Sequence, residues 1–143
     1  MFILLLLNLL WIYSTYTQAD TIDNYMNVYN AIPQMELKAD FDSQVWARSA
    51  RNVLAIANET IAETLMKAND EAKLKNHPFF CFLAGETLTA DLLGEIILNT
   101  YKNISSQQSD KNKMTVSQIA WLGLQKKYPC KTTNAPTNIF NDE

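Results

Sequence analysis

Residues 40–75, DFDSQVWARSARNVLAIANETIAETLMKANDEAKLK, decide the fold of this chain. Their spacing predicts one long α-helix with a buried stripe, because residues three and four apart share a helix face. We expect Asp42 or Ser43 to cap its start. We expect His77-Pro78 to end it, because the residue before a proline avoids the α region. The predicted buried stripe consists of Trp46, Ala50, Val53, Ala57, Ile61, Leu65, Ala68 and Ala72.

Two shorter helices are expected on either side of this segment. Residues 20–40 have weaker periodicity and predict a short helix or an ordered arm that Pro33 interrupts. Residues 90–104 predict a second helix, with Thr87 or Thr89 as its N-cap. One face of that helix gathers Leu93, Ile96, Ile97, Thr100, Tyr101 and Ile104.

The clearest local signal marks the start of a further helix, expected over residues 116–127. Thr115 and Gln118 form a T-x-x-Q capping box, in which each side chain accepts from a free backbone amide. Met114 and Ile119 stand at the positions of a hydrophobic staple. Together the segments predict an all-α fold, a small bundle of three to four helices.

Composition narrows the range of functions. The 143 residues include 12 Lys+Arg and 15 Asp+Glu, for a formal net charge of −3, with 3 Gly, 1 His and 2 Cys. An acidic chain without a basic run argues against binding to nucleic acid. A single His and two Cys leave little material for a zinc site, and we expect neither a metal nor another cofactor.

The first nineteen residues are interpreted as a secretory signal peptide. Phe2 to Trp11 is almost entirely apolar and too short to span a bilayer, and Thr17-Gln18-Ala19 suits cleavage after Ala19. An uncleaved N-terminal anchor is the alternative. Cleavage would release a periplasmic protein without membrane attachment, with a helical domain over residues 20–131 and a flexible tail over 132–143.

Export gives the two cysteines a role. Cys81 and Cys130 are the only cysteines, so an oxidising compartment permits just one intramolecular disulfide. We therefore expect a Cys81–Cys130 bridge. It would join the aromatic connector of residues 76–88 to the end of the last helix, beyond the polar loop of residues 105–113.

The sequence contains no convincing catalytic set, and we predict that the protein is not an enzyme. His77 is the only histidine and stands at a predicted helix end. Asp91 and Glu95 are four residues apart on one helix, but Asp91 is explained by the helix dipole. Trp46 and Trp121 are expected to pack in the core.

A resemblance to a known family rests on the C-terminal half. The chain has Phe80-Cys81, a turn that ends at Leu88-Thr89, an apolar helix near Tyr101-Lys102 and a polar loop. Met114-Thr115-Val116-Ser117, a helix with Ala120 and Leu124, and Tyr128-Pro129-Cys130 follow. Over residues 78–130 this pattern resembles the Rap/Tai-type immunity proteins of type VI secretion systems. The chain departs from that pattern in lacking a Gly-rich stretch near the first cysteine.

The resemblance implies protection by binding. Such a protein would bind a cognate toxin in the periplasm, a peptidoglycan amidase, and block its active site. The polar loop and the helix ends are candidate contact surfaces, and a homodimer is compatible with the short chain. The main alternative is a periplasmic helical chaperone or envelope-stress binding protein, which should expose a large apolar patch. An enzyme with two carboxylates in one cleft is a further alternative.

Overall fold

The computed structural model describes residues 21–104 and 110–130. Its elements are α2 (Ile22–Glu36), α3 (Phe41–Leu74), α4 (Ala90–Asn103), the 3₁₀ turn η1 (Lys111–Lys113) and α5 (Val116–Lys127). The predicted all-α bundle with one disulfide is confirmed. The predicted signal peptide and C-terminal tail lie outside the described residues.

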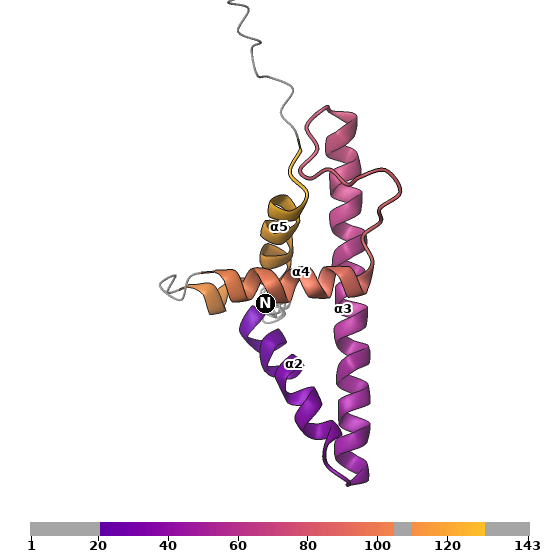
Figure 1. Cartoon of the computed structure of the whole chain (residues 1–143), viewed down its shortest axis with the longest axis vertical. Helices are drawn as coiled ribbons and strands as arrows, with labels where there is room; N and C mark the ends of the chain where they lie inside the picture. Colours follow the sequence, from indigo (N-terminus) through magenta and orange to yellow (C-terminus); the bar gives the residue numbers. More distant parts are fainter. Residues whose placement is uncertain (1–20, 105–109, 131–143) are drawn as a thin grey trace, which may run out of the picture.

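Figure 1 shows that α3 forms the long axis of the molecule. Its 34 residues correspond to roughly 50 Å of helix. A short turn leads from α2 into α3, and α2 packs along the first half of the longer helix. Helix α4 crosses α3, and α5 packs on α4 on the other side from α2 (Figure 1). The four helices therefore enclose one core around the α4 crossing.

The long helix begins earlier than predicted. Asp40, and neither Asp42 nor Ser43, is the N-cap: its carboxylate accepts a 2.8 Å hydrogen bond from the Ser43 amide. The predicted end is confirmed, because α3 stops at Leu74 before the His77-Pro78 pair. Asn76 follows with a φ of 60°, a left-handed conformation that asparagine tolerates better than most residues.

The buried face of α3 is rotated from the predicted stripe by roughly 60°, at 100° per residue. Trp46 and Val53 were expected in the core but are 40% and 59% exposed. Two asparagines at positions 58 and 69 are buried instead. The residues buried on α3 are Ala47, Ala50, Asn58, Ala62, Leu65, Asn69 and Ala72.

Hydrogen bonds explain this rotation. The Asn58 carbonyl oxygen accepts a 3.1 Å bond from the buried hydroxyl of Tyr25 on α2. The Asn69 side chain donates to the Phe80 carbonyl at 3.0 Å and accepts from the amides of Phe79 and Phe80. A buried polar group is costly only when it lacks a partner. Both asparagines can therefore face the core, and the apolar band beside them is left partly in solvent.

Pro33 does not interrupt α2, contrary to the prediction. The helix continues through it to Glu36. Proline removes one intrahelical hydrogen bond, but Ile32 beside it is buried in the core and holds the last turn in place.

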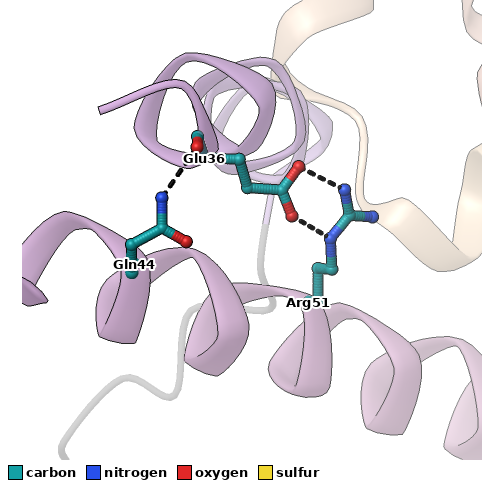
Figure 2. A network of polar contacts seen from close by, with 3 residues as sticks. All are labelled: Glu36, Gln44 and Arg51. Carbon is teal, nitrogen blue, oxygen red and sulfur yellow. Dashed lines mark hydrogen bonds and ion pairs between the residues drawn. The ribbon is translucent and has the colours of Figure 1, made fainter. Parts of the chain in front are cut away.

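Polar contacts to α3 also hold this last turn (Figure 2). The Gln44 amide donates to the backbone carbonyls of Glu36 and Lys38, both at 2.7 Å. Arg51 binds the Glu36 carboxylate through two nitrogens, at 2.6 and 2.7 Å. Its hydrogen bonds hold the pKa of Glu36 below the ordinary value of 4.5. Free carbonyls at the end of α2 thus find donors on the neighbouring helix.

The connector between α3 and α4 is fixed to the segment that follows α5. Cys81 and Cys130 form the predicted disulfide, with their Cα atoms 4.9 Å apart. The Cys81 amide also donates to the Tyr128 carbonyl at 2.8 Å. Phe80 is 1% exposed and packs edge-on to Phe82. Phe80 therefore belongs to the core, as the aromatic composition of the connector predicted, whereas Phe79 and Leu83 are exposed.

The predicted boundaries of the last two helices are confirmed. Thr89, one of the two predicted caps, accepts from the Leu92 amide at the start of α4. Thr115 and Gln118 make both bonds of the capping box on α5. The predicted polar loop of residues 105–113 is in part structured, since η1 occupies Lys111–Lys113.

Helices α4 and α5 approach closely at Gly123. A Cβ atom placed on this glycine would overlap the Thr100 hydroxyl and the Ile96 side chain. Only glycine therefore fits at this point without a movement of these side chains or of one helix against the other.

Candidate functional site

An open cleft lies where α2, α3 and α4 meet. It encloses about 490 Å³, within the range of small binding pockets. Its apolar walls come from all three helices: Ile32 and Pro33 on α2, Leu54 on α3 and Leu98 on α4. Because these residues are far apart in the sequence, the cleft exists only in the folded chain.

The base of the cleft is polar but fully paired. Tyr25 and Asn58 line it, and their mutual hydrogen bond satisfies the phenol and the amide oxygen. Burial raises the pKa of the Tyr25 phenol above its ordinary value of 10.0. Gly94 lies directly beside this pair, where an added Cβ would come 2.9 Å from the Asn58 amide nitrogen. The base is thus a hydrogen-bonded pair that packs closely against α4.

The proline in α2 changes the hydrogen bonding of one wall. Pro33 has no N–H to donate to the carbonyl of Tyr29 one turn earlier. Both residues line the cleft. The Tyr29 carbonyl therefore lacks its usual helical donor within α2.

The charges around the cleft are mostly negative. Asp91 and Glu95 line it from α4, and both side chains are exposed. Arg51 is the one cation among the lining residues, and its bidentate contact with Glu36 neutralises it. Neither Asp91 nor Glu95 is in an ion pair within residues 21–104 and 110–130. The cleft thus combines apolar walls with hydrogen-bond acceptors, a combination suited to the long stem and cationic head of a lysine or arginine.

The structure places the candidate catalytic residue His77 apart from the pair Asp91 and Glu95. His77 is exposed beyond the end of α3, and its backbone amide donates to the Ala72 carbonyl. Asp91 and Glu95 do share a cleft, but both are exposed to water.

The two tryptophans have different surroundings. Trp121 is half-buried and contacts the aromatic connector, with its ring centre 4.6 Å from that of Phe79. Beside it is a second, more apolar hollow of about 530 Å³ between α3 and α5. Trp46 lies on the outer side of α3, so the prediction that it packs in the core was wrong.

Sequence reasoning missed the cleft because its lining residues lack a common motif. Within the described residues, no group of three or more His, Cys, Asp and Glu could hold a metal ion. None of the helices in these segments has the length and apolarity needed to cross a bilayer. No family model, curated protein or solved structure matches the chain.

Proposed function

We propose that this chain is an exported binding protein that neutralises a protein toxin. The partner suggested by the resemblance over residues 78–130 is a peptidoglycan amidase delivered by a type VI secretion system. The protein would act in the periplasm by covering the toxin's active site, without chemistry of its own.

The observation that carries the proposal is the acidic cleft between α2, α3 and α4. Its apolar walls can take the stem of a basic side chain, while Asp91 and Glu95 accept hydrogen bonds from the charged head. Negative charge on the inhibitor would also speed the encounter with a basic enzyme surface. The paired cleft base keeps this surface rigid, which lowers the entropy lost on binding.

The direct test is co-purification of this protein with the product of the adjacent gene, together with protection of cells that receive that product in the periplasm. Glu95→Lys should weaken binding at least about 30-fold, because a charge pair would become a repulsion. Glu71→Lys changes an exposed carboxylate on α3 outside the cleft and serves as the matched control. Equal binding by both variants would remove the cleft from the interface. Absence of binding and protection would refute the immunity function.

A second function is favoured by a different observation. The outer side of α3 exposes Phe41, Val45, Trp46, Val53 and Ile56, the kind of surface expected of a periplasmic chaperone. A chaperone should suppress the aggregation of an unfolded client, as measured by light scattering at equimolar concentration. Suppression that Val53→Glu abolishes, in a protein that binds no toxin, would favour the chaperone function over immunity.

A further inference from the structure

The N-terminal half of α3 has a second apolar stripe on its outer side. Trp46, Ser49, Val53, Ile56 and Thr60 follow one another at steps of three and four. All five are exposed, including Ile56 at 63%. This is the heptad spacing with which helices pack side by side.

Two hydroxyl groups at the end of this stripe are already satisfied within the helix. Thr60 donates to the Ile56 carbonyl at 2.9 Å, and Thr64 donates to the Thr60 carbonyl at 2.8 Å. Neither hydroxyl needs water or a partner as acceptor, and their methyl groups extend the apolar surface. The apolar surface of the stripe therefore extends beyond Ile56 to Thr64, and Val45 lies at its other end.

We infer that a second copy of this chain covers the stripe, with the two α3 helices antiparallel and crossing near Val53. Large side chains then meet small ones across the two-fold axis. Trp46 lies opposite Thr60 of the second copy, and Ile56 lies beside its Ser49. Such a self-complementary arrangement is what a two-fold dimer requires.

Charge complementarity selects the antiparallel direction. Arg48 and Glu59 are exposed on the same edge of the stripe, at nearly equal distances on either side of Val53. Neither forms an ion pair within the described segments. Antiparallel pairing places each Arg48 beside Glu59 of the other copy, so that the symmetric interface contains two such pairs. Pairing in parallel would instead align each of these residues with its own copy and bring like charges together.

The size of the surface sets the expected strength. From Val45 to Thr64 the helix extends for about 29 Å, and a helix is about 10 Å wide. That projected footprint, about 300 Å² per copy, is smaller than the roughly 600 Å² per partner at the lower end of specific interfaces, which indicates a weak dimer. We therefore expect a dimer with a dissociation constant in the micromolar range.

Sedimentation of the full gene product, as the cell processes it, tests the dimer without any toxin. The unmodified protein should sediment as a dimer at about 100 μM and dissociate on dilution. Val53→Glu, on a side chain that is 59% exposed, should raise the dissociation constant at least tenfold while leaving the helical circular dichroism unchanged. Leu74→Glu, on an 85% exposed side chain at the end of α3, is the matched control and should leave it unchanged.

A charge exchange tests the direction of the helices. Arg48→Glu and Glu59→Arg should each weaken the dimer about three- to tenfold, since each change affects two symmetric pairs. The double variant R48E/E59R should restore it. The inference is overturned by a wild-type monomer at 100 μM, by an unaffected V53E dimer, or by a double variant weaker than both single ones.

Discussion

Replacement of Asn69 by alanine tests how the connector is attached to the long helix. The Asn69 side chain accepts from the Phe79 amide at 2.8 Å and from the Phe80 amide at 3.1 Å. It also donates to the Phe80 carbonyl at 3.0 Å. One side chain thus acts as the hydrogen-bonding partner for two consecutive residues. Alanine would remove all three bonds and would keep the helix intact.

The expected loss follows from the burial of these groups. Phe80 is 1% exposed, so its amide and carbonyl would be left in the core without partners. Each unsatisfied buried group costs about 1–3 kcal/mol, while the higher helix propensity of alanine returns about 0.5 kcal/mol. For the two groups of Phe80 the net loss is expected to be about 1.5–5.5 kcal/mol, and at about 4 °C per kcal/mol the midpoint Tm should fall by about 6–22 °C.

Thermal unfolding followed by circular dichroism, at one protein concentration for all variants, measures this loss. Asn99→Ala is the matched control, because Asn99 is an exposed asparagine inside α4. The control should be unchanged or slightly stabilised by helix propensity. A fall of less than about 2 °C for Asn69→Ala relative to this control would show that the Asn69 bonds do not hold the connector.

Three further outcomes are expected. Gly123→Ala should lower the Tm by about 4–8 °C, because an overpacking cost of about 2–3 kcal/mol exceeds the gain of about 1 kcal/mol in helix propensity. An unchanged or higher Tm would contradict the close approach of α4 and α5. Cys81→Ser combined with Cys130→Ser opens a loop with a sequence separation of 49 and should cost about 4 kcal/mol in urea unfolding. Reduction of the disulfide in the wild-type protein should reproduce that loss. A loss below about 1 kcal/mol would refute the expected contribution of the disulfide to stability. Arg51→Gln should destabilise the protein at neutral pH. Arg51 lowers the pKa of Glu36, so the stabilisation by this ion pair is complete above the ordinary value of 4.5 and disappears as the pH falls through the lowered pKa. The Tm difference between Arg51→Gln and wild type should therefore vanish in acid. A difference that persists there would exclude the ion pair as its cause.

Much of the secondary structure was predictable because it depends on neighbouring residues. The capping box of Thr115 and Gln118 closes within one turn, so its sequence pattern is enough to place the start of α5. The Pro33 prediction failed for the opposite reason. The continuation of α2 depends on the burial of Ile32 and on contacts from Gln44, which belongs to another helix.

The sequence by itself determined the helices, most of their ends and the one cysteine pairing available to the chain. Those features follow from side-chain spacing, local hydrogen bonds and the number of cysteines. Only the tertiary structure decided which face of α3 is buried, because that depends on whether Asn58 and Asn69 find partners on other segments. It also decided the position of the acidic cleft and of the exposed stripe around Val53. Both surfaces arise from the angles at which α2 and α4 pack on α3, and residues distant in sequence set those angles.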